Sequence, residues 1–399
     1  MPNYLEGTFI DNKKKPIHRW FDYLEGYSEV LVKSELKILK DVNRLYEPFS
    51  GSGTTPLVGV INGVDSYYSE VNPVMQFVTK VKTCTAFKVA HNMQKVNYLH
   101  DVISDIGTKL IPRDTDSPSL NGFEKYYSDN NLRFIIAYKN LIANITDQDV
   151  RDILLLALAS SAVPTSKMIR RGDLRFAKGQ KEENRANQAF KPFIMAKLSQ
   201  MFEDILLVRD NHVSESVLLS ADAREINNYE PNMMDAVITS PPYLNGTNYF
   251  RNTKLELKLL DYINSEKDLS AMYDKGIVAG INNVSKRRKI LEPMDSVLPY
   301  YDKLKTAAYD ARIPKMVSGY FWGMDSVIDR LRILVRPKGI VVIDIGDSQF
   351  AGVHIPTHDL LSDLFTNHGF VKLSEDVLRH RRSRNGLVLT QRKIRYRRL

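Results

Sequence analysis

The stretch that most constrains the fold is residues 235–243, which read Asp-Ala-Val-Ile-Thr-Ser-Pro-Pro-Tyr. Its first half is apolar and β-branched, as in a buried parallel strand. The chain must then leave the sheet at Pro241 and Pro242, because proline lacks a backbone N–H donor and fixes φ. The turn places the Ser240 hydroxyl and the Tyr243 ring at the carboxyl end of a strand, where ligands bind in open α/β sheets. An ordinary strand exit would look the same, so other motifs must decide whether this turn is a site.

A glycine-rich turn lies near the N-terminus, directly after a short strand that we predict at residues 43–49. Two glycines two positions apart let the backbone turn tightly and approach a ligand closely. A helix that begins near Thr55 would aim free N–H groups at that ligand. The next predicted strand, residues 67–71, carries Glu70, 17 residues beyond Gly53 and close to the spacing of a ribose-binding acid in a Rossmann-like unit. The alternative is an ordinary strand–turn–helix with a solvated Glu70. The turn reads Phe49-Ser50-Gly51-Ser52-Gly53-Thr54-Thr55-Pro56.

The composition narrows the class of protein. A chain of 399 residues allows one large domain with insertions or two domains. The formal net charge of +9 is weak support for a polyanionic partner. Cys84 is the only cysteine, which excludes internal disulfides and is typical of the cytosol. The histidines show no metal-ligand spacing, and neither a signal core nor an apolar run of roughly 20 residues is present. We therefore expect a cytoplasmic protein without a metal or a membrane partner.

The order of strands and helices predicts an α/β fold. Five parallel-type strands alternate with helices, and an antiparallel-looking pair closes the sheet, which gives a Rossmann-like core with a seven-stranded, mostly parallel sheet. The last two strands are expected at residues 371–378 and 387–396. We assign to this core residues 1–85, 212–264 and 315–399.

Two segments interrupt that core. Apolar residues recur at helical spacing in residues 131–145, 147–169 and 193–207, so residues 86–211 are interpreted as a helical insertion. Residues 265–314 are interpreted as an irregular insertion and a candidate DNA-contact or target-recognition region.

Three basic segments are candidates for contact with a polyanion. They lie in residues 168–191, 286–289 and 379–386, the last of which carries an Asn-Gly hairpin signal. Each is either a solvated surface or a segment that contacts phosphates. The candidate nucleic-acid contacts are Arg170, Arg171, Arg175, Lys178, Lys286, Arg287, Arg288, Arg381 and Arg382.

Two strings of this sequence resemble those of a known family. Residues 48–55, Pro-Phe-Ser-Gly-Ser-Gly-Thr-Thr, and residues 239–243, Thr-Ser-Pro-Pro-Tyr, are together similar to the S-adenosylmethionine-dependent amino-methyltransferases that act on nucleobases in DNA. Residues 23–28, 70–73 and 222–224 add weaker matches. The likeness covers about half of the chain and does not extend to the two insertions. It implies that the core is a catalytic methyltransferase domain and that S-adenosyl-L-methionine is the cofactor.

The resemblance also implies roles for individual residues. The glycine turn would lie against the methionine and ribose of the cofactor, and Glu70 would hold the ribose hydroxyls. Asp222 would meet the adenine amino group, and Ser28 would lie near the methionine carboxylate. The family usually has aspartate before Pro-Phe, whereas this chain has Glu47, which leaves the role of that position open. The implied cofactor-binding residues are Ser28, Phe49, Gly51, Ser52, Gly53, Thr54, Thr55, Glu70, Val71, Asp222 and Ala223.

The residue types of the second string suit methyl transfer to an exocyclic amino nitrogen. The lone pair of that nitrogen is delocalised into the ring, so two acceptors aimed at its hydrogens favour the tetrahedral geometry that attack requires. The Ser240 hydroxyl and the Pro241 carbonyl are the candidates, and Tyr243 would stack on a base flipped out of the duplex. Together with Pro242 they are the predicted catalytic residues. Carbon-directed cytosine methylation needs a cysteine after a proline, and Cys84 lies between two threonines.

The choice of base depends on Ser240. In the resembled family, serine at this position goes mostly with cytosine N4, and aspartate or asparagine with adenine N6. We therefore predict a site-specific N4-cytosine methyltransferase of duplex DNA, with an N6-adenine enzyme as the alternative. It would belong to a restriction-modification or defence system, with a cognate restriction endonuclease as a partner. An RNA base methyltransferase or a non-catalytic nucleic-acid-binding protein is the alternative from another class.

Overall fold

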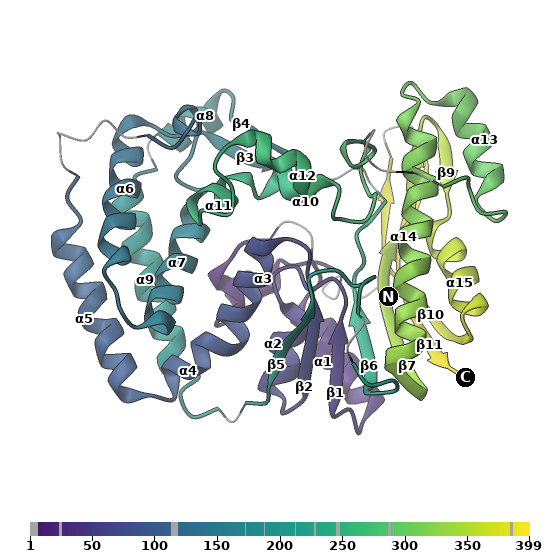
Figure 1. The fold of residues 1–399 in the computed structure, drawn as a ribbon, viewed down its shortest axis with the longest axis horizontal. Coiled ribbons are helices and arrows are strands. Elements are labelled where there is room, and N and C mark those ends of the chain that lie inside the picture. Colours follow the sequence, from purple (N-terminus) through teal and green to yellow (C-terminus); the bar gives the residue numbers. More distant parts are fainter. Residues whose placement is uncertain are drawn as a thin grey trace.

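The fold is built on one seven-stranded sheet (Figure 1). The computed structural model describes residues 7–399 except 24–25, 113–118, 172, 187, 212, 227–228, 245–247, 286–288, 290 and 384–385. The strand order is β10-β11-β7-β6-β1-β2-β5. The five strands from β5 to β7 run parallel, and β11 lies antiparallel between β7 and β10. The Rossmann-like, mostly parallel sheet predicted from the sequence is thus confirmed. The strands are β1 (Arg44–Glu47), β2 (Asp65–Ser69), β5 (Ser216–Ser220), β6 (Met234–Thr239), β7 (Val335–Gly346), β10 (Phe370–Arg382) and β11 (Val388–Arg398).

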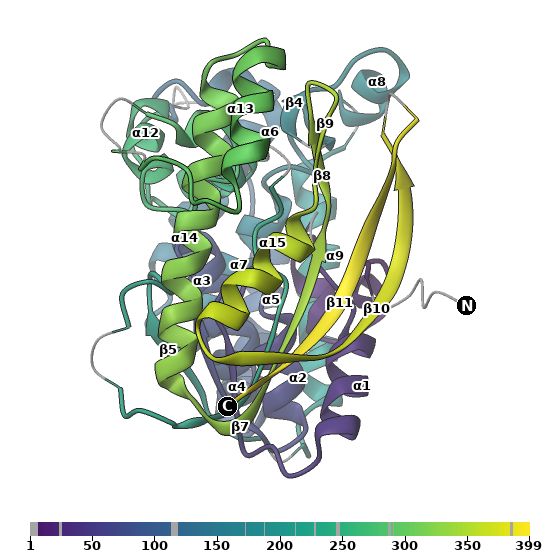
Figure 2. The ribbon, with the colours of Figure 1, turned by 90° about the vertical axis from the view of Figure 1, so that its right-hand side faces the viewer.

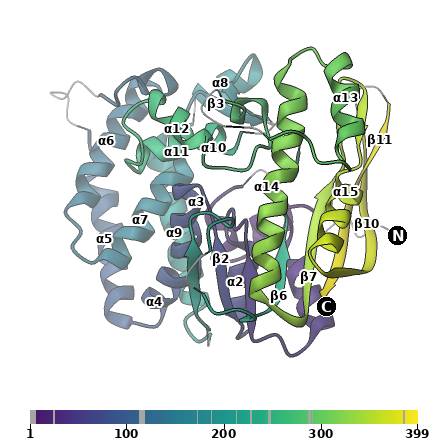
Figure 3. The ribbon, with the colours of Figure 1, turned by 45° about the vertical axis from the view of Figure 1, so that its right-hand side comes forward.

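Helices cover both faces of the sheet, because successive strand side chains point to opposite faces. Tyr46, Val237 and Ile343 pack in one buried cluster with α14 (Arg312–Leu334) and α15 (Thr357–Asn367). Their chain neighbours Leu45, Ile238 and Val342 pack in another with α1 (Glu29–Leu39) and α2 (Thr54–Ile61). Figure 3 shows α14 across the front of the sheet, and Figure 2 shows β10 and β11 as a long two-stranded ribbon.

A second group of helices stands beside the sheet, on the left in Figure 1, and has a hydrophobic cluster of its own. It comprises α5 (Met93–Lys109), α6 (Asp129–Ala143), α7 (Gln148–Ser161) and α9 (Phe190–Leu207). It follows α3 (Pro73–Lys80), a π-helical turn (Val81–Thr85) and α4 (Ala86–Ala90). We call this group the helical unit.

The helix predicted at residues 147–169 is too long. It ends at Ser161, and Met168 begins a hairpin of β3 (Met168–Arg171) and β4 (Asp173–Phe176), followed by α8 (Gln180–Ala186). Pro164 explains the difference, because proline cannot donate to the helical ladder and disfavours helix in the residue before it.

Residues 265–314 are more regular than expected. They contain α12 (Leu269–Tyr273) and α13 (Leu298–Ala307), and α14 already begins at Arg312. Pro314 lies in the first turn of α14, where a missing N–H costs no intrahelical hydrogen bond, so it does not end the helix.

Asp204 of α9 anchors the N-terminal segment to the helical unit. Its buried carboxylate accepts hydrogen bonds from the Ile17 amide at 2.9 Å and the Trp20 indole at 2.8 Å. The Arg19 guanidinium donates to the same carboxylate at 2.5 and 3.1 Å. Removing a partner of this kind leaves buried donors and a charge unpaired.

We expect Asp204→Ala to lower the free energy of unfolding by about 3–5 kcal/mol, because the donors around Asp204 lose their acceptor. Urea denaturation followed by far-UV circular dichroism measures this change. Asp105→Ala is the matched control. Asp105 forms an exposed ion pair with Lys109, and such pairs contribute about 0–1 kcal/mol. Equal losses in the two variants would contradict the anchoring role of Asp204.

Candidate cofactor and target-base site

A cavity of about 640 Å³ lies where the glycine turn, the segments that follow β2 and β5, and the Ser-Pro-Pro-Tyr turn meet. Its volume falls within the roughly 300–1,000 Å³ of small-molecule sites. These segments follow four neighbouring strands and meet at the carboxyl edge of the sheet, as expected for a doubly wound fold. Eight predicted cofactor residues line the cavity: Phe49, Gly51, Ser52, Thr54, Glu70, Val71, Asp222 and Ala223.

The glycine turn needs both of its glycines. Gly51 and Gly53 have φ of 50° and 79°, a region that residues with a Cβ rarely adopt. A Cβ on Gly51 would lie 3.1 Å from the Tyr23 ring, and one on Gly53 would lie 3.0 Å from the Thr79 hydroxyl. The turn is thus shaped for a close approach of its backbone to whatever fills the cavity.

Lys82 holds the same turn from behind. Its buried ammonium donates a hydrogen bond to the Ser52 carbonyl at 2.6 Å. Burial lowers the pKa of Lys82 to about 7. Lys82 lies in the π-helical turn, a feature that often marks functional regions. Its contact with Ser52 was not anticipated from the sequence, because it depends on the packing of that turn beneath the glycines.

Glu70 faces the cavity from the end of β2. Its carboxylate accepts hydrogen bonds from the Gly51 amide at 2.7 Å and the Asn72 amide at 2.8 Å. Burial raises the pKa of Glu70 to about 7, and these backbone hydrogen bonds oppose that rise. Each carboxylate oxygen has further acceptor capacity, so ligand hydroxyls can bind without breaking the contacts to the turn. This arrangement fits the ribose of a nucleoside.

Asp222 has a partner that the sequence did not suggest. Its carboxylate pairs with the Arg224 guanidinium at 2.5 Å, and Arg224 also donates to the Lys275 carbonyl at 2.6 Å. The pairing draws residues 275–277 to the cavity wall beside Ala223. An adenine contact by Asp222 stays a prediction.

Three predicted cofactor residues do not line the cavity. The Ser28 hydroxyl caps α1 by accepting from the Val30 amide at 3.1 Å. Gly53 is the N-cap residue of α2, and the Thr55 hydroxyl donates to the Ile238 carbonyl at 3.1 Å. Their positions explain local structure, and a direct cofactor contact for each stays a prediction.

Glu47, the departure from the family pattern, lies behind the cavity wall. Its buried carboxylate accepts from the Phe49 amide at 2.9 Å and from the hydroxyls of Thr239 and Tyr27. Burial raises the pKa of Glu47 to about 7, and the hydrogen bonds oppose the rise. Glu47 therefore ties the exit of β1 to the exit of β6 and sets the two turns side by side.

The Ser-Pro-Pro-Tyr turn ends in a polar cluster. All four residues line the cavity. The Tyr243 hydroxyl donates to Asp344 of β7 at 3.1 Å, and Gln391 of β11 donates to both carboxylate oxygens of Asp344 at 2.8 Å. The Arg381 guanidinium lies 5.9 Å from the centre of the Tyr243 ring. Asp344 and Gln391 were not predicted as site residues, although Asp344 is the one polar interruption of the β-branched run at residues 340–345.

The predicted nucleic-acid contacts do not form one surface. Arg170 lies in the cavity wall, where its guanidinium pairs with the buried Glu256 of α11 (Lys254–Leu259). Arg381 also lines the cavity, and Arg171 lies on β3. A phosphate contact by Arg170 or Arg381 stays a prediction. Arg175, Lys178 and Arg382 are exposed, whereas Lys286, Arg287 and Arg288 lie outside the described residues.

The strand order defines a Rossmann-like α/β fold, with the cavity at the carboxyl edge of its parallel strands. No family model matches the chain. Its sequence is similar to the Type II methyltransferase M.AvaI of Nostoc sp., with 25% identity over 401 residues that cover 91% of this chain and 81% of the relative. It is 23% identical over 360 residues to the Type II methyltransferase M.BsoBI of Geobacillus stearothermophilus, covering 83% and 67%. For the Type II methyltransferase M.MvaI of Kocuria varians the identity is 18% over 390 residues, covering 92% and 84%.

Solved structures are more distant. The crystal structure of TrmN from Thermus thermophilus matches with a TM-score of 0.29 and 11% identity, over 93% of this chain and 49% of that chain. The rRNA methyltransferase aviRa from Streptomyces viridochromogenes matches with a TM-score of 0.31 and 7% identity, over 96% and 85%. The three sequence relatives, and not the solved structures, relate the chain to the Type II methyltransferases. They confirm the relationship predicted from its motifs. This relationship implies S-adenosylmethionine as the methyl donor.

The described residues contain no helix long and apolar enough to cross a membrane. Among the same residues, no group of three or more histidine, cysteine or acidic side chains is placed to hold a metal ion.

Proposed function

We propose that this chain is a site-specific DNA methyltransferase that modifies the exocyclic N4 amino group of cytosine in duplex DNA. The observation that carries the proposal is one cavity lined by the glycine turn, Glu70 and the Ser-Pro-Pro-Tyr turn. The relationship to Type II methyltransferases supports DNA as the substrate and a restriction-modification setting, with a restriction endonuclease as the partner.

One end of the cavity suits the cofactor. S-adenosylmethionine supplies a methyl group carried on a sulfonium, which is a strong electrophile. We propose that the backbone of Gly51 and Ser52 lies along its methionine and ribose. Glu70 accepts hydrogen bonds from the ribose hydroxyls, and Val71 and Ala223 contact the adenine. These residues orient the donor, and orientation carries much of the acceleration of a transfer between two bound reactants.

The other end suits the amino group of a flipped base. The Ser240 hydroxyl and the Pro241 carbonyl accept the two amino hydrogens and favour the tetrahedral nitrogen that attacks. The Tyr243 ring provides a stacking surface, and the two prolines hold the turn rigid. Serine at the first position supports cytosine over adenine through the family resemblance, and adenine N6 is the second candidate.

To test the proposal, the protein is incubated with labelled S-adenosylmethionine and one of three substrates: unmethylated duplex DNA, single-stranded DNA or tRNA. Digestion to nucleosides and mass spectrometry then identify the modified base, and we expect N4-methylcytosine from duplex DNA. N6-methyladenine would establish the second candidate, and transfer to tRNA alone would contradict DNA as the substrate. A folded sample that fails to bind S-adenosylhomocysteine would indicate a nucleic-acid-binding protein without catalysis.

Two exposed cations, Arg175 on β4 and Lys178 just after it, give a test of DNA binding. We expect the double variant Arg175→Gln, Lys178→Gln to bind duplex DNA more weakly. The slope of log affinity against log salt should fall in magnitude by about 1–2, because each phosphate contact releases about one counterion. Fluorescence anisotropy at several salt concentrations measures this slope. Lys37→Gln, an exposed position on α1, should leave it unchanged. An unaltered slope in the double variant would indicate that Arg175 and Lys178 belong to a solvated surface.

A further inference from the structure

Two arginines of β10 face the cavity beside the Ser-Pro-Pro-Tyr turn. Arg379 and Arg381 are two positions apart in the strand, and both line the cavity. Because side chains alternate along a strand, His380 and Arg382 point to the opposite face, and both are exposed. The long ribbon of β10 and β11, seen in Figure 2, therefore presents two guanidinium groups to the cavity.

Both guanidinium groups have a buried donor without an acceptor. The Nε atoms of Arg379 and Arg381 are buried, and neither has a hydrogen-bond partner within the part of the chain that the structure describes. Arg170, in another part of the cavity wall, is by contrast paired with Glu256. Buried polar atoms are rarely left without a partner, so each exception calls for an explanation. Acceptor atoms of a ligand in the cavity would satisfy these two donors.

Arg381 lies beside the ring that we assign to stacking on the flipped base. Its guanidinium carbon is 5.9 Å from the centre of the Tyr243 ring. A Cβ on Gly346, the last residue of β7, would lie 2.8 Å from Nη2 of Arg381 and 3.2 Å from the Tyr243 ring. Glycine at that position therefore leaves room for the two side chains to meet. Arg381 thus belongs to the target-base end of the cavity.

The edge of cytosine next to its amino group carries two acceptors in a row. N3 adjoins the carbon that bears the amino group, and the O2 carbonyl follows. The guanidinium of arginine is a planar fork that can donate two parallel hydrogen bonds to such a pair. Adenine has N1 next to its amino-bearing carbon and then a C–H group, so one donor of the fork would stay unpaired. An arginine fork at this edge therefore distinguishes cytosine from adenine.

We propose that Arg381 selects the target base by donating hydrogen bonds to N3 and O2 of a flipped cytosine. The inference rests on the proposed function and deepens it, because it names a residue that selects the base. The Ser-Pro-Pro-Tyr turn holds the amino group and one face of this base, whereas Arg381 contacts its edge. Enzymes that flip a base recognise it through its Watson–Crick edge and through stacking, and the two parts of the site supply both.

Arg379 offsets a negative charge that would repel this edge of the base. It lies opposite Gln391 in the ladder of β10 and β11, and Gln391 donates to both oxygens of Asp344 at 2.8 Å. Burial raises the pKa of Asp344 to about 6, and the positive charges of Arg379 and Arg381 oppose that rise. A carboxylate without these charges beside it would disfavour the N3 and O2 acceptors. With them, this end of the cavity favours an edge that carries acceptors.

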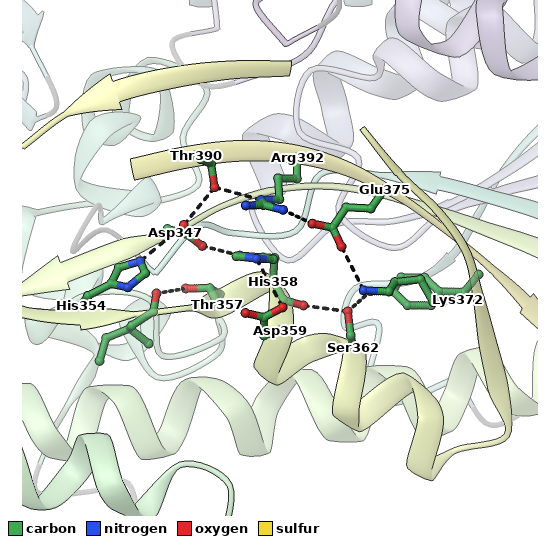
Figure 4. A network of polar contacts seen from close by, with 12 residues as sticks. Asp347, His354, Thr357, His358, Asp359, Ser362, Lys372, Glu375, Thr390 and Arg392 are labelled. Carbon is green, nitrogen blue, oxygen red and sulfur yellow. Dashed lines mark hydrogen bonds and ion pairs between the residues drawn. The ribbon is translucent and has the colours of Figure 1, made fainter. Parts of the chain in front are cut away.

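A polar network on the opposite face of the ribbon holds these strands in place. Thr390 donates to Asp347 at 2.9 Å, and Arg392 donates to Thr390 at 3.0 Å. Arg392 also pairs with Glu375 of β10, and His358 of α15 lies 2.5 Å from Asp347. Figure 4 shows these side chains linking β10 and β11 to α15 and to the exit of β7. The two cavity-facing arginines are therefore carried on a strand that is fixed against the sheet, as precise recognition of a base requires.

The test compares two target bases that differ in one acceptor. Duplexes carry, at the position that the enzyme methylates, either cytosine or 3-deazacytosine, which keeps O2 and the amino group but has C–H in place of N3. Single-turnover rates are measured for the wild type, Arg381→Met and Arg381→Lys, so that the intrinsic reactivity of each base cancels between proteins. We expect the preference of the wild type for cytosine to shrink by about 10–100-fold in Arg381→Met. Lysine keeps the charge without the fork, so Arg381→Lys should also lose most of the preference.

Arg397→Met is the matched control for these variants. Arg397 is exposed near the end of β11 and pairs with Ile340 of β7, away from the strand end that borders the cavity. Its preference between the two bases should equal that of the wild type. Circular dichroism checks that each variant is folded.

Two further measurements separate the base edge from other acceptors. A loss of affinity for S-adenosylhomocysteine in Arg381→Lys would place Arg381 on the carboxylate of the cofactor. A salt slope of duplex binding that falls by about 1 in Arg381→Met, with equal rate losses for both bases, would place it on a phosphate. Either result, or a wild-type preference kept in both variants, would overturn the inference and leave the proposed function standing. A wild type that methylates adenine, or no cytosine, would overturn both.

Discussion

Ser240→Ala is expected to slow methyl transfer by about 100–1,000-fold while leaving cofactor affinity within about twofold. The change removes one of the two acceptors that we propose for the amino hydrogens. The ring of Tyr243 and both prolines stay, so the base can still stack in the cavity. Rapid-quench single-turnover kinetics measure the rate, and calorimetry with S-adenosylhomocysteine measures the affinity.

Ser326→Ala is the matched control for that experiment. Ser326 is exposed on α14, and its hydroxyl bonds only to the Trp322 carbonyl one turn earlier among the contacts of the described chain. Its rate and its cofactor affinity should equal those of the wild type. A large loss of cofactor affinity in Ser240→Ala would instead place Ser240 against the cofactor.

Glu70→Ala is expected to weaken S-adenosylhomocysteine binding by about 100-fold. Two hydrogen bonds from ribose hydroxyls to a charged carboxylate are lost, at about 1.5–3 kcal/mol each, and residual contacts offset part of this. The Gly51 and Asn72 amides also lose their acceptor, so the glycine turn loosens. Calorimetry measures the affinity, and circular dichroism checks that the variant is folded.

Cofactor affinity should also depend on the ionisation of Glu70. Burial raises the pKa of Glu70 to about 7, and hydroxyl donors bind the ionised form better. The wild-type affinity for S-adenosylhomocysteine should therefore fall as pH drops through about 7, and Glu70→Ala should abolish that dependence. Glu230→Ala, at an exposed loop position, should behave as the wild type. A wild-type pH profile retained in Glu70→Ala would assign the dependence to another group.

Local sequence was sufficient for one half of the site. The glycine turn needs positive φ at Gly51 and Gly53, and only a glycine meets that need without strain. Ser240 to Tyr243 follow a β-branched strand directly, so their place at a strand end could be predicted. Both motifs are short, and the residues that make up each motif are adjacent in the sequence.

The other half depends on how distant strands pair. Asp344 meets Tyr243 because β7 lies beside β6, and Gln391 meets Asp344 because β11 inserts antiparallel between β7 and β10. A slip of one residue in β11 would turn Gln391 to the opposite face. That register is set by the packing of β11 on both faces, which no local pattern reports. Glu256 was missed for the same reason, since its partner Arg170 lies on β3, far away in the sequence.

The prediction of one helix end was wrong because a proline, and not the apolar spacing, determines where that helix stops. The apolar spacing of residues 147–169 continues past Ser161, but Pro164 ends the helix and the chain turns into a hairpin. In α14 a proline is harmless, because Pro314 falls in the first turn. The same residue type therefore has opposite consequences at the two ends of a helix.

The helical unit departs from the carboxyl end of β2 and returns to the amino end of β5, and these two strands are hydrogen-bonded neighbours. It replaces the single crossover helix that would otherwise join them. An insertion placed this way can be lengthened, shortened or exchanged during evolution at a modest loop-closure cost. Such a change would alter the part of the cavity wall that contains Arg170. The strand ends that carry Glu70 and Ser240 would stay unaltered.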